Sequence, residues 1–184
     1  MTSQASRPTR TSPSSAIHAP ATAWLDWSSP IGELRLVQTA GQLSAIWFRD
    51  SPHCRDIEAP QAEQAADFQP TLDQLSEYFA GTRREFNLDL APEGTEFQHR
   101  VWACLRTIPH GESRTYAWLA RAIQQPSAVR AVASANARNP ISILIPCHRV
   151  IGSDGRLSGY AGGIDRKAWL LELEGHPARF REGA

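Results

Sequence analysis

The chain has 184 residues, enough for one domain or two small ones with a buried core. Its formal net charge is zero, and no apolar run approaches the roughly 18 residues that a membrane span needs. Its three cysteines are an odd number without short pair spacing, which argues against a disulfide framework or a zinc knuckle. We therefore expect a protein of a reducing compartment, the cytoplasm.

The charges are distributed unevenly along the chain. Residues 1–94 contain seven Arg against twelve acids, whereas residues 95–184 contain eleven Arg and one Lys against seven acids. A basic half on a neutral chain favours a phosphate-bearing partner on that side only. Ordinary solvated surface charge is the alternative.

The N-terminal segment differs in composition from the rest of the chain. Residues 1–20 are rich in Ser, Thr, Ala and Pro and contain no continuous apolar stretch, so a secretory signal is not indicated. We predict a flexible tail for residues 1–22, with a transit peptide as the weaker alternative.

Residues 23–93 have the pattern of a small α/β domain. Between Trp24 and Phe48, turn residues at 28–32 and at Gly41 separate segments of apolar–polar alternation, which predicts two or three strands of one sheet. Residues 50–70 are polar and interrupted by Pro, so we predict mainly a connection there. Its neighbouring His and Cys, residues 53 and 54, have no second pair at a metal-ligand spacing, which favours an ordinary loop.

A helix and a further strand are predicted to complete this domain. Three apolar residues have the spacing of one helix face, and Gly81 ends the helix: Leu72, Leu75 and Phe79. Alternating apolar residues then predict a last strand that returns to the sheet: Phe86, Leu88 and Leu90.

The character of the chain changes at Gly94, and residues 94–176 are predicted to form a second domain. Thr95 and Gln98 form a capping box, which predicts the start of a helix that ends at residues 109–111. A second helix is expected to begin at Thr115. A third, capped by Ser127, would run to about residue 137, and together the last two form a helix-turn-helix.

The second helix of this pair consists mostly of small residues. Such a helix can enter a groove or pack tightly against a neighbouring helix, and both alternatives remain open. Arg130 fits the second alternative less well, because a charge among small residues needs a partner. Its small residues are Ala128, Ala131, Ala133, Ser134 and Ala135.

The stretch from residue 143 to 150 carries the chemistry. Three branched apolar residues at 143–145 predict a short buried segment, which Pro146 stops. A thiol, an imidazole and a guanidinium follow at Cys147, His148 and Arg149. Neighbouring cations favour the thiolate, which is the nucleophilic form of cysteine. An inert buried cysteine is the alternative.

Residues on either side of this stretch complete the candidate site. Asn139 precedes Pro140 at the joint after the small-residue helix and is expected to bond to nearby main chain. A last helix is predicted with Asp165 as its cap, followed by a C-terminal tail at 177–184. Glu174 lies at the end of that helix, where the dipole disfavours an acid, so we expect a cationic partner such as His148.

The segment Ile145-Pro146-Cys147-His148-Arg149-Val150 resembles the acceptor-cysteine signature of the O6-alkylguanine-DNA alkyltransferases (methylated-DNA–protein-cysteine methyltransferases), and the chain is similar to their stand-alone bacterial type. The similarity runs from about Trp24 to Gly175. Its further segments are Arg130-Ala131-Val132, Asn139-Pro140, Gly159-Tyr160-Ala161-Gly162-Gly163, Lys167-Ala168-Trp169-Leu170-Leu171 and Glu174-Gly175. At residue 161 many members carry Ser, and at 133–134 they commonly carry Gly-Gly or Gly-Ala.

The resemblance implies a small N-terminal β-sheet domain with a helix, and a mainly helical, winged-helix-like C-terminal domain. It implies irreversible, stoichiometric transfer of an alkyl group from O6-alkylguanine in duplex DNA to a cysteine, with base flipping. O4-alkylthymine is a second candidate substrate. The expected partner is double-stranded DNA that contains alkylated bases. The protein is expected to act as a monomer, with no cofactor, no metal ion and no association with a membrane.

The resemblance also implies roles for individual residues. Cys147 would accept the alkyl group, and His148 and Glu174 would complete a relay through a bridging water. Arg130 would replace the flipped nucleotide in the minor groove. The supporting residues would be Asn139, Tyr116 and Lys167; the DNA-binding residues would also include Tyr116, Ala128, Ala131 and Ser134; and the base pocket would include Val150, Tyr160 and Ala161.

Three other functions are alternatives to this one. A non-catalytic lesion binder of the same family would lack the acceptor cysteine, so Cys147 counts against it. A sequence-reading helix-turn-helix regulator needs base-reading side chains, where this helix offers mostly Ala. A thiol hydrolase with a Cys-His-Glu triad would turn over repeatedly, and the sequence leaves this test to experiment.

Overall fold

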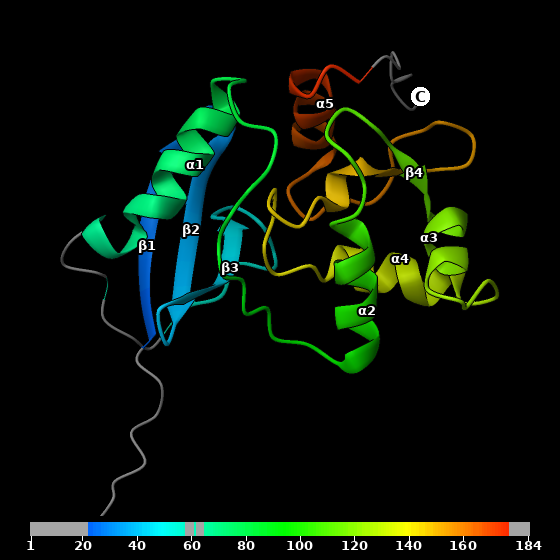
Figure 1. Cartoon of the computed structure of the whole chain (residues 1–184), viewed down its shortest axis with the longest axis horizontal. Coiled ribbons are helices and arrows are strands. Elements are labelled where there is room, and N and C mark those ends of the chain that lie inside the picture. Colours follow the sequence, from blue (N-terminus) through cyan, green and yellow to red (C-terminus); the bar gives the residue numbers. More distant parts are fainter. Residues whose placement is uncertain (1–21, 58–60, 62–64, 177–184) are drawn as a thin grey trace, which may run out of the picture.

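The protein is described here by a computed structural model that defines residues 22–57, 61 and 65–176 (Figure 1). The predicted tails at 1–22 and 177–184 lie outside the described residues, except for Thr22, which begins the first strand. Among the described residues, no helix combines the length and the apolar character that crossing a membrane requires.

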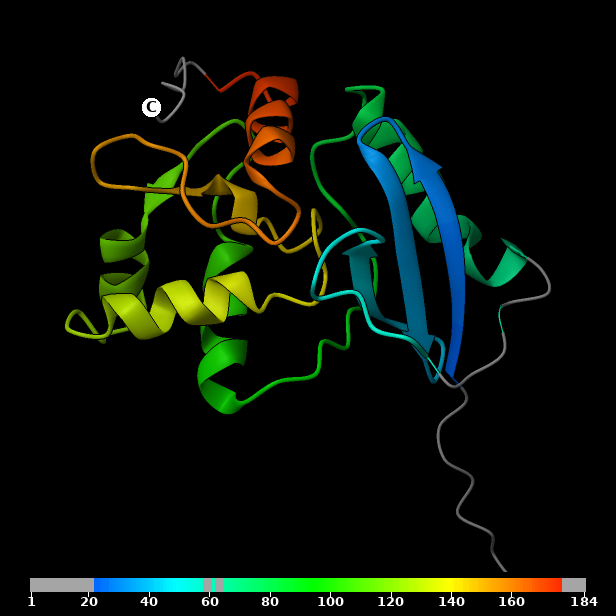
Figure 2. The same ribbon diagram turned by 180° about the vertical axis from the view of Figure 1, so that it is seen from behind.

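The N-terminal part is a three-stranded antiparallel sheet in the order β1 (Thr22–Ser29), β2 (Gly32–Thr39) and β3 (Gln42–Phe48). The predicted turns join the strands, and Gly32 and Gly41 adopt the positive φ values of 115° and 77° that favour glycine. Helix α1 (Gln69–Phe79) follows a 3₁₀ turn (Ala65–Phe68) and lies along one face of the sheet (Figures 1 and 2). The prediction of a sheet with one helix is confirmed.

The free edge of β3 is covered by two segments from later in the chain. Main-chain bonds join Leu43 to Asp89 and Ala91 at 3.1 and 2.9 Å, and Ile46 to Pro140 and Ser142 at 2.9 and 3.1 Å. Unpaired edge groups are thereby satisfied. The second contact fastens the joint that follows α4 directly to the N-terminal sheet.

The predicted strand through Phe86, Leu88 and Leu90 is wrong, because only a single bridge forms, between Leu43 and Leu90. The main chain at Asn87 bonds instead to the side chain of Gln74 on α1, at 2.8 and 3.0 Å. Alternating apolar residues cannot reveal that a helix side chain has taken the place of a strand partner.

The C-terminal part contains four helices around a two-residue parallel strand pair, β4 (Arg114–Thr115) and β5 (Val150–Ile151). Helix α2 (Glu96–Leu105) begins with the predicted capping box, in which Gln98 N donates to Thr95 Oγ1 at 3.3 Å. Helix α3 (Tyr116–Ala122) begins one residue after the predicted start, with Thr115 as its cap, and α4 (Val129–Ala137) completes the helix-turn-helix.

Two of the predicted helix caps are wrong. Helix α4 begins after Ala128, because Ser127 lies in a turn that is closed by the bond from Ala128 N to Gln125 O, 2.9 Å. Helix α5 (Ile164–Leu173) begins after Gly163, whose φ of 91° favours glycine. Asp165 therefore lies within the first turn of α5, where an acid still suits the helix dipole.

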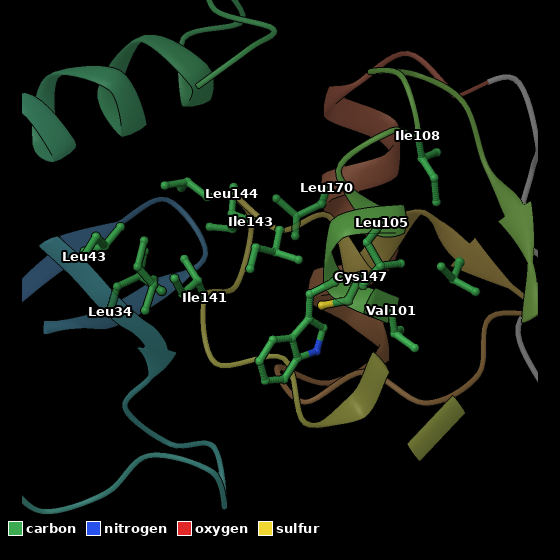
Figure 3. Packing of buried hydrophobic residues seen from close by; sticks show 14 of the residues in the cluster. Leu34, Leu43, Val101, Leu105, Ile108, Ile141, Ile143, Leu144, Cys147 and Leu170 are labelled. Carbon is green, nitrogen blue, oxygen red and sulfur yellow. The ribbon is translucent and has the colours of Figure 1, made fainter. Parts of the chain in front are cut away.

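A single hydrophobic core joins the two parts of the chain and includes the candidate nucleophile. Figure 3 shows the sulfur of Cys147 among apolar side chains of the C-terminal part, and Leu34 and Leu43 of the sheet on the other side of Ile141. Within this core, Trp102 on α2 donates to the main-chain oxygen of Ala135 at 2.9 Å. That bond fixes the buried side of α4 and leaves its opposite side at the surface.

Candidate active site

The segment before the cysteine is a tight, buried turn rather than a strand. Bonds from Leu144 N to Ser142 O (2.9 Å) and from Ile145 N to Ile141 O (3.1 Å) close it. Ile143 adopts φ of 73°, an unfavourable conformation for a β-branched residue that costs about 1–3 kcal/mol. The burial predicted for residues 143–145 is confirmed, since none is more than 6% exposed. The turn places the thiol facing inward.

Cys147 lies at the start of a 3₁₀ turn (Cys147–Arg149) and is only 3% exposed. Asn139 Nδ2 donates to its sulfur at 3.0 Å and to Ile145 O at 2.7 Å, while Asn139 Oδ1 accepts from Ile141 N at 3.0 Å. Asn139 thus bonds to nearby main chain as predicted. In addition, it places a hydrogen-bond donor on the sulfur, which stabilises a thiolate.

His148 and Glu174 are in direct contact in the interior. His148 is fully buried, and its Nε2 lies 2.9 Å from Glu174 Oε1. A carboxylate can only accept, so Nε2 carries the proton and Nδ1 keeps its lone pair. Nδ1 is buried and has no hydrogen-bond partner among the described residues, which leaves it free to accept a proton.

Glu174 accepts hydrogen bonds from three further groups. Arg149 donates to both carboxylate oxygens at 2.8 Å, Tyr78 Oη donates to Oε1 at 2.7 Å, and Gly111 N donates to Oε2 at 3.2 Å. Burial would raise the pKa of Glu174, but the bonds from His148 and Arg149 hold it far below its usual range. The predicted cationic partner is Arg149, while His148, the partner suggested by the sequence, donates to the same carboxylate.

The resting thiol and imidazole are both neutral. Burial raises the pKa of Cys147, although the Asn139 bond and the nearby charge of Lys167 act in the opposite direction. Burial also lowers the pKa of His148, against the pull of Glu174. The expectation that neighbouring cations favour a resting thiolate is thus outweighed by burial, because Arg149 is already neutralised by Glu174.

Lys167 is a fully buried lysine on α5 near the thiol. Its ammonium donates to Val150 O at 2.6 Å and to Ser158 O at 2.8 Å. Burial lowers the pKa of Lys167 to about 8, and the nearby Cys147 opposes that shift. Lys167 therefore links the main chain after Cys147 to the loop before Tyr160 while it keeps a positive charge close to the sulfur.

Most of the predicted DNA-binding residues lie on α4 or at its start, outside this buried cluster. Arg130 is exposed and makes no hydrogen bond or ion pair within the described part of the chain, and Ala131 beside it is also exposed. Ala128 is half-buried, and Ser134 accepts a bond from Arg138. Tyr116 at the start of α3 donates to Ser158 O at 3.1 Å.

Tyr160 and Ala161 line a cavity of about 530 Å³, which also includes Asp50 to His53 and Arg166. The ring of Tyr160 lies edge-on to His148 at 6.5 Å. From the N-terminal part, Ser51 Oγ donates to Ala161 O at 3.0 Å. The loop at 159–163 thus lines the cavity, whereas Val150, the other predicted pocket residue, is fully buried and is not among the lining residues.

A larger cleft, about 730 Å³, opens between the sheet and Asn139 but is not lined by the thiol, imidazole or carboxylate of the buried cluster. His53 and Arg55 lie on its wall. In the described ranges, no three His, Cys, Asp or Glu side chains gather closely enough to hold a metal ion.

Sequence reasoning missed Arg149, Tyr78 and Gly111 as partners of Glu174. Arg149 had a signal, because it is charged, lies inside the motif and is buried with it. Tyr78 and Gly111 had none, because they are 96 and 63 residues away from Glu174 along the chain.

Two family descriptions match nearly the whole described chain. Residues 26–92 match the ribonuclease-like domain of 6-O-methylguanine DNA methyltransferase, and residues 96–176 match its DNA binding domain. The chain belongs to the 6-O-methylguanine DNA methyltransferase family, whose enzymes are methylated-DNA–protein-cysteine methyltransferases.

Individual relatives share the full two-part layout. The chain is 48% identical over 151 residues to the methylated-DNA–protein-cysteine methyltransferase of Methanosarcina acetivorans, covering 81% of this chain and 96% of the relative. It is 47% identical to the Mycobacterium leprae enzyme of the same name, covering 80% and 89%. The crystal structure of Mycobacterium tuberculosis OGT in complex with DNA superposes with a TM-score of 0.76 at 45% identity, covering 83% and 92%.

Proposed function

We propose that this protein repairs O6-alkylguanine in duplex DNA by moving the alkyl group onto Cys147. The observation that carries the proposal is the orientation of the buried pair. Glu174 holds the proton of His148 on Nε2, so the lone pair of Nδ1 is available to take the thiol proton of Cys147. Membership of the family and the likeness to a DNA-bound relative support DNA as the partner.

The transfer is a displacement at saturated carbon. Cys147 loses its proton to His148, through a bridging water because adjacent residues do not face each other directly. The sulfur forms a bond to the alkyl carbon as the bond between that carbon and O6 breaks. The electron pair of the broken bond stays on O6 of the base. The base then takes up a proton and is restored to guanine. Donation by Asn139 and the charge of Lys167 stabilise the thiolate as it forms.

The protein would reach the base by flipping it out of the duplex. The exposed, narrow face of α4 suits close approach to the minor groove, and Arg130 is free to fill the gap in the base stack. Tyr116 and the loop containing Tyr160 and Ala161 border the place for the extruded base. In this proposal the C-terminal domain, residues 94–176, carries both functions, and the N-terminal domain, 23–93, supports it.

Each molecule would act once, as a monomer and without a cofactor. A thioether has no easily displaced leaving group, and nothing in the relay returns the alkyl group to another acceptor. The test is incubation with excess O6-methylguanine duplex, followed by intact-mass measurement. One added methyl per protein, located on Cys147, is expected, and a parallel O4-methylthymine duplex tests the second substrate.

Cys147→Ala is the matched control for this experiment. It should gain no mass while it still shifts the lesion duplex in a gel, because the other groups that border the base remain. Continued demethylation beyond one equivalent would overturn the proposal and favour a hydrolase.

A further inference from the structure

One side chain of the N-terminal part reaches into the relay. Tyr78, near the end of α1, is 1% exposed, and its hydroxyl lies 2.7 Å from Glu174 Oε1. Figures 1 and 2 show α1 on the sheet side of the molecule, whereas α5, which ends next to Glu174, belongs to the C-terminal part. Apart from Tyr78, all the described donors to this carboxylate come from the C-terminal part.

The direction of this hydrogen bond follows from the protonation of both groups. Burial and the neighbouring charge of Glu174 raise the pKa of Tyr78 far above its ordinary value, so the phenol keeps its proton. Glu174 is an anion, because its pKa is lowered by its bonds to His148 and Arg149 despite burial. Tyr78 is therefore a permanent donor to Glu174.

Tyr78 and His148 share the same acceptor atom. Oε1 also receives the Nε2 proton of His148 at 2.9 Å and a guanidinium proton of Arg149 at 2.8 Å. Each donor withdraws electron density from the oxygen and so weakens its hold on the others. A third donor on Oε1 fixes the carboxylate in place and limits how strongly it stabilises a protonated His148.

We propose that Tyr78 is a positioning residue of the alkyl-transfer reaction, through which the N-terminal domain sets the orientation of Glu174 toward His148. This inference rests on the function proposed above. It gives the N-terminal domain a part in the proton relay, although that domain supplies no group that touches the reacting atoms.

Several other groups act on this relay, and all of them must stay in place during a test. The charged or titratable groups that face Glu174 or His148 come from the 3₁₀ turn at 147–149, from α5 and the segment that follows it, and from the loops at 110 and 160: Arg149, Lys167, His176, His110 and Tyr160. Tyr78→Phe removes one hydroxyl and leaves each of them unchanged.

The ring of Tyr78 also has a packing role that must be separated from its hydroxyl. It contacts Phe79 edge-on at 5.5 Å and Phe86 at 5.3 Å between ring centroids. Tyr78→Phe keeps these ring contacts. Phe79→Leu, by contrast, loses a ring contact but keeps the hydroxyl on Glu174, so it is the matched control for packing alone.

The experiment measures single-turnover methyl transfer from O6-methylguanine duplex across the pH range in which His148 titrates. Without the Tyr78 donor, Glu174 accepts more strongly from His148 and stabilises its protonated form. Protonated His148 cannot take the thiol proton, so the acid limb of the Tyr78→Phe profile should move to higher pH, by roughly half a pH unit. The plateau rate should fall by about threefold, because the carboxylate loses one of the hydrogen bonds that fix its position.

The control and the parent protein make every outcome decisive. Phe79→Leu should melt earlier than the parent but keep the acid limb where the parent has it. If both variants shift the limb equally, or neither does, the positioning role is overturned. If the parent itself transfers no methyl group, the proposed function fails; a parent that transfers normally, with an unshifted Tyr78→Phe profile, removes only the inference about Tyr78.

Discussion

The cluster around Glu174 and the exposed face of α4 differ in how their charges are paired. In the cluster, Glu174 is bonded to Arg149, His148, Tyr78 and a main-chain amide, all in the interior. On α4, Arg130 is exposed and has no ion-pair or hydrogen-bond partner within the described residues. A buried charge must be neutralised within the fold, whereas an exposed one can wait for a partner from outside. The proposed roles of the cluster in chemistry and of α4 in DNA contact should therefore be separable by mutation.

The largest effect is expected where the buried compensation is broken. Glu174→Gln leaves Arg149 in the interior without its carboxylate, which costs about 3–5 kcal/mol of folding free energy. Transfer should slow by about 100-fold, because Gln cannot stabilise the protonated form of His148. The remaining activity should then climb with pH, since direct ionisation of Cys147, whose pKa burial raises, must supply the thiolate.

Rates of mass gain across pH, together with thermal melting, test this prediction. The parent serves as reference, and a profile of the same shape as the parent's would remove Glu174 from the relay.

The exposed region should respond in a substrate-dependent manner. Arg130→Ala should slow repair of duplex DNA by about tenfold or more, because unstacking a base costs a few kcal/mol that the side chain would partly offset. Reaction with the free base O6-benzylguanine needs no flipping and should be nearly unchanged, if the cavity accepts the larger group.

The reactivity of Cys147 toward a simple alkylating reagent is the control for a cavity that is too small for the benzyl group. Equal losses on duplex and free base would show that Arg130 shapes the site rather than the DNA, and its minor-groove role would be withdrawn.

Two glycines allow the packed surroundings of Glu174 to be compared with an open loop. Both Gly111 and Gly155 have positive φ, at 79° and 77°. A Cβ at Gly111 would lie 2.8 Å from the main-chain oxygen of Glu174, whereas one at Gly155 meets nothing within 4 Å. Gly155→Ala should cost about 1 kcal/mol through φ strain alone, and Gly111→Ala about 2 kcal/mol more through the added clash.

Denaturant unfolding of the two variants measures this difference directly. Transfer by Gly111→Ala should also slow, because the clash displaces the Glu174 end of α5. Equal stability of the two variants would mean that the loop at residue 111 yields without disturbing the cluster.

The smallest expected effect is the pH dependence of stability. The pKa of His148 is lowered in the folded state by burial, against about 6.5 when unfolded. As the pH falls below the unfolded-state pKa, the unfolded chain takes up a proton on His148 before the folded protein does. The contribution of His148 to stability is therefore complete above this pKa. Below it, the free energy of unfolding declines by at most about 1.4 kcal/mol per pH unit. His148→Gln should flatten this slope.

His110 and His176 also have lowered pKa values but remain in both proteins, so the difference between the two slopes reports His148. Identical slopes for parent and variant would contradict a neutral His148 in the folded protein.

Local sequence patterns were sufficient for most of the fold. The capping box at Thr95, the turns at Gly32 and Gly41, and the helix start at Thr115 depend on bonds between residues at most a few positions apart, and all were predicted. The motif from residue 145 to 150 and the acid at the end of α5 were sufficient to name Cys147, His148 and Glu174 as candidates. A thiol, an imidazole and a carboxylate indicate this chemistry by their residue types alone.

The tertiary structure alone decided how those groups are protonated and held. Protonation depends on desolvation, which no local pattern reports, so a cysteine beside two basic residues turned out to be a neutral thiol. The donors from Tyr78 and Gly111 reach Glu174 across 96 and 63 residues of chain. Such long-range contacts arise only when the sheet, its helix and the C-terminal part pack around one core, and hydrogen-bond partners in that core are set by position in space and not by position in the chain.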